Sequence, residues 1–144
     1  MSLDMPTMRT RFRRPITAAI GAAAMLGAIA TPAQAAGSFT SYLAKAGHDF
    51  DSRRWNEAAS DVNTKIVFEG CFGRGSVNVS LAKDITAAPD PFYSMANFTN
   101  CFTGNTAQST GTWGDHGGGN YYFVIDVGMV GGGVTNVNWL KVSW

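Results

Sequence analysis

The stretch from Val62 to Glu69 (VNTKIVFE) decides the fold of this chain. Branched or aromatic side chains occupy every second position of it, namely Val62, Thr64, Ile66 and Phe68, and polar side chains occupy most positions between them. Successive side chains of a β-strand point to opposite faces. A repeat of two therefore predicts a strand with one buried face and one hydrated face.

Further strand candidates lie on both sides of this stretch. They are residues 39–45, which also suit one helical turn, and residues 77–81, 98–102, 110–113, 121–127 and 134–144. Gly, Asn, Thr and Ser separate them, and long runs of Ala, Leu, Glu and Lys are missing beyond residue 35. This pattern disfavours a helical bundle and predicts an all-β chain. We expect an antiparallel β-sandwich or small jelly roll of about six to eight strands.

The sequence also predicts how two of these candidate strands, 77–81 and 121–127, are placed in the sheets. The stretches 62–69 and 77–81 are joined by the glycine-rich segment 70–75, and we expect them to form an antiparallel hairpin with a long loop. The stretch 121–127 is the most apolar of all. It is therefore expected to be a central strand that is covered on both faces for much of its length.

The last candidate, residues 134–144, changes its alternation halfway. Val137 and Trp139 fall on odd positions, whereas Leu140, Val142 and Trp144 fall on even positions. An extra residue near Trp139 and Leu140 restores the alternation, so we predict a β-bulge there. The apolar pattern continues to Trp144, the last residue, which indicates that this end of the chain is held in the sheet.

Cys71 and Cys101 are the two cysteines of the sequence. Neither belongs to a CxxC motif, and their spacing does not suit a zinc site. An even pair in a small exported domain is most simply an intramolecular disulfide. We therefore predict a Cys71–Cys101 bond.

The first 35 residues have the composition of an export signal. A basic segment, Met8–Arg14, precedes the apolar run Ile16–Ala30, and Ala33–Ala35 supplies the small-x-small pattern that signal peptidases accept. The apolar run is shorter than the roughly twenty residues of a membrane-spanning helix. We expect cleavage before Ala36 and secretion of residues 36–144 as a single domain; an uncleaved N-terminal anchor is the alternative.

Residues 36–144 hold seven Lys or Arg and nine Asp or Glu residues, which gives a net charge of −2 with neutral histidines. The basic character of the full chain thus belongs to the leader. Because no polybasic patch remains, nucleic acid and anionic membranes are excluded as expected partners. We expect a monomer without a cofactor.

Two polar loops are candidates for a binding site. The first, Gly47–Asn56, contains His48 and the D-x-D pair Asp49 and Asp51, whose carboxylates would share a side in an extended segment and suit Ca²⁺. The alternative is a charged loop in which an arginine pairs with one of the two aspartates while Trp55 anchors the loop in the core. Only if His48 came close to the second loop would a larger metal site be expected.

The second loop is Trp113–Asn120, which combines Asp115 and His116 with three consecutive glycines. Glycine permits close approach of a ligand to the backbone, although the alternative is a solvated hairpin loop. Because of this glycine-rich context, Trp113 is the tryptophan that we expect to be exposed. Trp139 and Trp144 fall on positions of opposite parity and need not share a face.

These features favour a binding protein over an enzyme, and the predicted ligand-binding residues are Trp55, Trp113, Asp115 and His116. The expected target is an extracellular carbohydrate, a cell-envelope component or a protein, with a carbohydrate-binding module as the first hypothesis. A secreted protease inhibitor or antimicrobial toxin is the alternative. A small metal-assisted hydrolase that uses His48 or His116 is disfavoured, and the sequence contains no GxSxG motif.

Overall fold

The computed structural model describes residues 37–58, 63–126 and 133–144. Apart from one 3-10 turn, the regular elements within these ranges are strands. They are β1 (Ser38–Ala46), β2 (Phe50–Asp51), β3 (Trp55–Glu57), β4 (Thr64–Phe72), β5 (Val77–Asp84), β6 (Phe92–Phe98), the turn η1 (Asn100–Phe102), β7 (Gln108–Trp113), β8 (Gly119–Asp126) and β9 (Thr135–Ser143).

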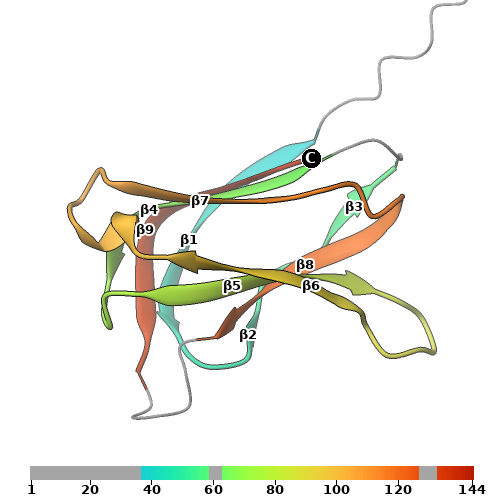
Figure 1. The fold of residues 1–144 in the computed structure, drawn as a ribbon, viewed down its shortest axis with the longest axis horizontal. Helices are drawn as coiled ribbons and strands as arrows, with labels where there is room; N and C mark the ends of the chain where they lie inside the picture. Colours follow the sequence, from blue (N-terminus) through green and yellow to red (C-terminus); the bar gives the residue numbers. More distant parts are fainter. Residues whose placement is uncertain (1–36, 59–62, 127–132) are drawn as a thin grey trace, which may run out of the picture. The chain divides into compact units, whose positions relative to one another are not determined.

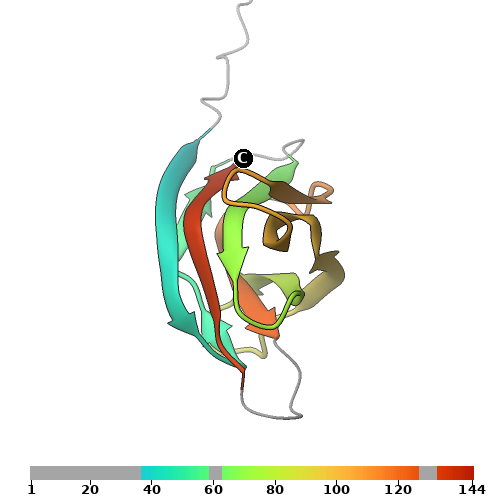
Figure 2. The ribbon, with the colours of Figure 1, turned by 90° about the vertical axis from the view of Figure 1, so that its left-hand side faces the viewer.

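The strands form two sheets that pack face to face (Figure 1). The first sheet has the order β1-β9-β4-β7, and the second has the order β2-β8-β5-β6, with β3 also paired to β8. Every pairing is antiparallel. Figure 2 shows β1 at the edge of the first sheet, beside β9 and β4. The predicted antiparallel β-sandwich is confirmed, and apart from the pairs β2–β3 and β5–β6 successive strands lie in opposite sheets, as in a jelly roll.

The expected hairpin of residues 62–69 and 77–81 is wrong. The strand β4 pairs with β7 and β9, whereas β5 pairs with β6 and β8 in the opposite sheet. The link between them crosses the sandwich, with Gly73 and Gly75 at φ +128° and +82°. Both strands bury one apolar face, and facing sheets let them bury these faces against each other.

The alternation nevertheless identified the buried faces correctly. Ile66 and Phe68 of β4 are fully buried, and so are three odd-numbered residues each of β5 and β8; these are Val77, Val79, Leu81, Tyr121, Phe123 and Ile125. The ring of Phe68 packs edge-on against Phe98 and Phe123, with centroids 4.9 and 5.7 Å away. The strand β8 lies between β5 and the short strands β2 and β3, as expected for a central strand. Val62 and Val127 lie outside the described residues.

The predicted bulge in the last strand is confirmed. Between the pairs Ser41↔Leu140 and Leu43↔Val137, β1 has one intervening residue and β9 has two. In this ladder with β1 the extra residue lies at Asn138–Trp139, directly beside the predicted position, where the inward positions change from odd to even; the register of β9 with β4 is unbroken.

The predicted disulfide joins Cys71 of β4 to Cys101 of η1 across a sequence separation of 30 residues. The strand expected at 98–102 is misplaced, because β6 ends at Phe98 and the chain then turns through η1. This turn buries Cys101 completely, and the Cys101 N–H donates to the hydroxyl of Ser109.

The C-terminal residue is held as expected. Its N–H donates to the Gly37 carbonyl, and the Trp144 ring packs against Phe39 and Trp55. The expected leader and cleavage site at 1–36 lie outside the described residues. Within the described part, no helix has the length and hydropathy that crossing a membrane requires.

Candidate binding surface

Trp113 is buried, so the expectation that it is exposed is wrong. Only 2% of its surface is exposed, because it is the last residue of β7 and its side chain points into the sandwich. Its indole N–H donates to the Ser94 carbonyl of β6, in the opposite sheet. A Cβ at Gly111 would lie 2.6 Å from the indole, so glycine at this position makes room for the ring.

Trp55 is also in the core, with 5% of its surface exposed. Its ring lies between Tyr121 and Trp144, with centroids 6.5 and 6.0 Å away. The indole N–H donates to the buried carboxylate of Glu57, which also accepts from the Thr64 hydroxyl. Trp55 thereby anchors its loop in the core, as the alternative interpretation of this loop expected.

Asp115 and His116 lie in a loop with several internal contacts. The His116 imidazole stacks on Tyr93 at 3.6 Å, and the His116 carbonyl accepts from Lys83 Nζ at 2.9 Å. Asp115 accepts from the Gly117 N–H, and the Tyr121 hydroxyl donates to the Gly117 carbonyl. Burial, with the nearby Glu57 carboxylate, raises the pKa of Tyr121, so this donor stays protonated. The contacts hold the loop in place; a ligand at Asp115 and His116 stays a prediction.

The two histidine-bearing loops do not meet. His48 Nδ1 lies 2.9 Å from Asp126 Oδ1 at the end of β8, whereas His116 precedes the start of this strand. At about 3.3 Å per residue, the length of β8 separates them by roughly 25 Å. The larger metal site that required both loops is therefore not formed.

The proposed calcium ligands Asp49 and Asp51 have different surroundings. An oxygen of Asp49 lies 3.4 Å from His48 Nε2, and Asp51 is close enough to Arg54 to raise the pKa of the guanidinium, although less than the Asp84 hydrogen bond does. Among the described residues, no three His, Cys, Asp or Glu side chains are grouped to hold a metal ion. The geometry thus offers no support for Ca²⁺ at Asp49 and Asp51.

A different surface presents aromatic side chains to solvent. Tyr42 of β1 is 70% exposed, and its position between the inward Ser41 and Leu43 places it on the outer face of the first sheet. Trp139 of β9 is partly exposed, and it lies on the same outer face because Leu140 beside it points inward. The two residues meet the same irregularity of the β1–β9 ladder, so they occupy neighbouring strands at the same level.

The outer face around these residues is polar. Cross-strand pairing places Thr40, Lys141, Val67 and Thr110 in one row, and Trp139, Glu69 and Gln108 in the next. Lys65 and Ser143 form a third row with Thr112. We call this surface, the outer side of β1-β9-β4-β7 with Tyr42 and Trp139 as its aromatic residues, the aromatic face.

The charges of the aromatic face are mostly positive. Glu69 accepts a hydrogen bond from the Gln108 amide. Lys65 and Lys141 lie on adjacent strands, and within the described residues neither forms an ion pair. The face therefore combines flat apolar rings, hydroxyl and amide groups, and two ammonium groups.

The sequence analysis missed the aromatic face because its residues come from opposite ends of the domain. One signal for it was present, since Trp139 falls on the parity that β9 turns outward beyond its bulge. Nothing in the sequence places Tyr42 next to it. Comparison with protein-family models, curated proteins and solved structures finds no match.

Proposed function

We propose that this chain is a secreted protein that binds a polysaccharide on the aromatic face. The observation that carries the proposal is the pairing of a 70% exposed tyrosine with a partly exposed tryptophan on neighbouring strands of a polar sheet. Aromatic rings have an apolar face that packs against the C–H groups of a sugar ring, and the surrounding polar groups can hydrogen-bond to its hydroxyls. The jelly-roll architecture also occurs in lectin domains.

The charge of the face supports an acidic polysaccharide over a neutral one. Lys141 lies one row from Trp139 on this face and Lys65 lies two rows away, and two ammonium groups without ion-pair partners among the described residues attract carboxylate-bearing chains. This attraction is screened by salt, whereas ring stacking is not. Binding should therefore weaken, without vanishing, as the salt concentration rises.

Secretion is supported by two separate features. The basic and apolar leader at residues 1–35 is typical of an export signal. The Cys71–Cys101 bond is compatible with an oxidising compartment such as the extracellular space. Intact mass measurement of the protein recovered from the medium tests both, because the proposal requires a chain that begins at Ala36 and contains no free thiol.

The binding test compares insoluble and soluble polysaccharides, both neutral (cellulose, chitin, xylan) and acidic (pectate, alginate). We expect retention by at least one acidic chain and a loss of about ten-fold or more in affinity for Trp139→Ala and Tyr42→Ala. Phe92→Ala is the matched control, because this ring is 61% exposed but lies on β6 of the opposite sheet. Absence of binding to every polysaccharide, or equal binding by all three variants, would overturn the proposal.

A further inference from the structure

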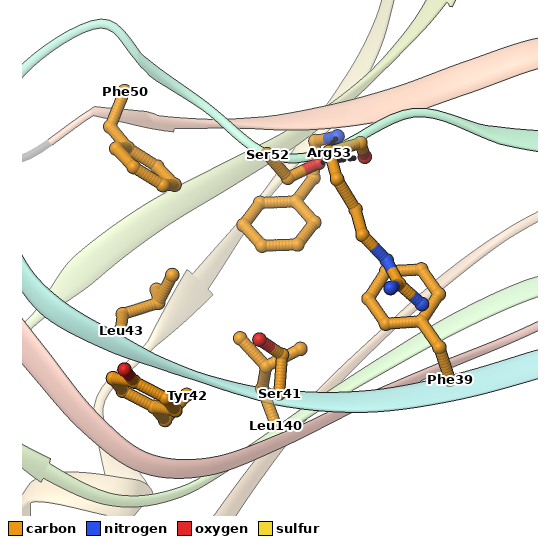
Figure 3. A pocket seen from close by; sticks show the side chains of 9 residues that line it. Phe39, Ser41, Tyr42, Leu43, Phe50, Ser52, Arg53 and Leu140 are labelled. Atoms are coloured by element: carbon orange, nitrogen blue, oxygen red, sulfur yellow. Dashed lines mark hydrogen bonds between the residues drawn. The ribbon is translucent and has the colours of Figure 1, made fainter.

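A small cavity lies between the free edges of the two sheets, where β1 faces β2 (Figure 3). Its volume is about 110 Å³. Apolar side chains from both sheets line it: Leu43 from β1, Phe50 from β2, Phe123 from β8 and Leu140 from β9. The cavity therefore reaches the hydrophobic core from the edge of the sandwich.

The sequence explains why this space is not filled. Phe39, Ser41 and Leu43 alternate on the side of β1 that faces the second sheet; Ser41 is paired with the buried Leu140 but is itself exposed at this open edge. A serine at this inward position has a side chain of two heavy atoms where its neighbours on the strand have large apolar groups. The missing volume forms the cavity opening, with Ser41 at its lower side in the view of Figure 3.

Arg53 supplies a positive charge at this opening. Its guanidinium carbon lies 3.6 Å above the centre of the Phe39 ring, in a cation–π contact that holds the side chain along the cavity (Figure 3). No ion pair among the described residues involves Arg53. The neighbouring Arg54 has a different environment, since it pairs with Asp84 and lies over the Tyr122 ring.

The segment that carries Arg53 is fixed to the core. The Ser52 N–H donates to the Phe123 carbonyl, and the Ser52 hydroxyl accepts from the Phe123 N–H. The same hydroxyl donates to the Arg53 carbonyl. The backbone of Arg53 is thus preorganised, which lowers the entropic cost of pairing its guanidinium with a ligand.

From this geometry we propose that the cavity binds a small carboxylic acid in its ionised form. The apolar group of the ligand enters between Leu43, Phe50 and Leu140, and its carboxylate pairs with the Arg53 guanidinium. Apolar protein cavities of about 150 Å³ bind benzene, so 110 Å³ suits a branched or aromatic group of about four to six carbons. Guanidinium–carboxylate pairs are charge-assisted and directional, which favours a carboxylate over a neutral polar group.

The proposal is tested by NMR titration of the protein with four probes: phenylacetate, 3-methylbutanoate, acetate and phenylacetamide. We expect the first two to shift the resonances of Leu43, Phe50 and Leu140, with the strongest binding among the four. Acetate lacks the apolar group and phenylacetamide lacks the charge, so each should bind about ten-fold or more weakly. Equal binding of phenylacetate and phenylacetamide, or no binding of either acid, would overturn the proposal.

Substitutions test whether the ligand binds in this cavity, and they distinguish the contribution of the Arg53 charge from that of the cavity volume. Arg53→Gln should weaken phenylacetate binding about ten-fold and leave phenylacetamide unchanged, whereas Ser41→Leu should weaken both by filling the cavity. Arg54→Gln is the matched control, because the adjacent arginine is turned toward Asp84 and should not affect binding. Equal effects of the two arginine variants would contradict the assignment. Tyr42 belongs to the aromatic face and also lines the cavity, but none of these substitutions changes Tyr42 or Trp139, so they test the cavity separately from polysaccharide binding.

Discussion

The two edges of the sandwich differ, since the β6–β7 edge is closed by contacts between the sheets and the β1–β2 edge is not. Where β6 and β7 meet, the disulfide ties η1 to β4, and the Trp113 indole bonds to a carbonyl of β6. A Cβ at Gly111 would lie 3.1 Å from the Ala96 side chain, so the strands here are in close contact. Where β1 and β2 face each other, no sheet ladder joins them and a cavity remains.

This difference indicates how a small domain can remain stable although one of its edges is imperfectly packed. Core voids cost stability because their walls lose contacts. A covalent link on the opposite edge restricts the unfolded chain and thereby offsets such a loss. We infer that the β6–β7 edge stabilises the fold and that the β1–β2 edge is the one free to bind a ligand.

We expect the largest change in the free energy of unfolding from removal of the disulfide. The double variant Cys71→Ala/Cys101→Ala should lower the free energy of unfolding by about 3–4 kcal/mol, because a loop of 30 residues is no longer closed in the unfolded chain. Urea unfolding followed by far-ultraviolet circular dichroism measures the change. A loss below about 1 kcal/mol would show that the β6–β7 edge does not depend on its cross-link.

A smaller effect is expected from Trp113→Phe. The substitution removes the donor to the Ser94 carbonyl and part of the packing of the buried Trp113 between the sheets, at a cost of about 2 kcal/mol. Tyr42→Phe is a suitable control, since this ring is 70% exposed and its change should stay within about 0.5 kcal/mol. The same urea titration compares them. Similar values for the two variants would mean that the contact across the edge contributes little.

The sequence predicted the local geometry of this fold better than its assembly. The repeat of two identified the buried residues of β4, β5 and β8, because side-chain alternation is a property of each strand alone. The change of parity at Trp139 and Leu140 located the bulge for the same reason. The partners of a strand depend on the whole chain, so the expected β4–β5 hairpin was wrong.

The site was harder to predict than the fold. Trp113 was expected to be exposed because glycines follow it, but as the last residue of β7 it has the inward parity of this strand, which decides its burial. Tyr42 and Trp139 are far apart in the sequence and become neighbours only through the pairing of β1 with β9. The cavity is present because Ser41 is small. Its place beside the cavity could not be predicted from the sequence, because it depends on the pairing of Ser41 with Leu140.

The smallest effect is expected from Ser41→Leu, and it tests the open edge directly. The larger side chain enters the cavity and buries apolar surface, so the free energy of unfolding should rise by about 0.5–1 kcal/mol. Thr40→Leu is the control, because the adjacent position of β1 lies on the outer face of the sheet and does not line the cavity. Urea unfolding measures both variants. If Ser41→Leu destabilises the domain instead, the cavity walls have no room for the added carbons. If it stabilises the domain and also loses carboxylate binding, the cavity is a feature that costs stability and serves a ligand.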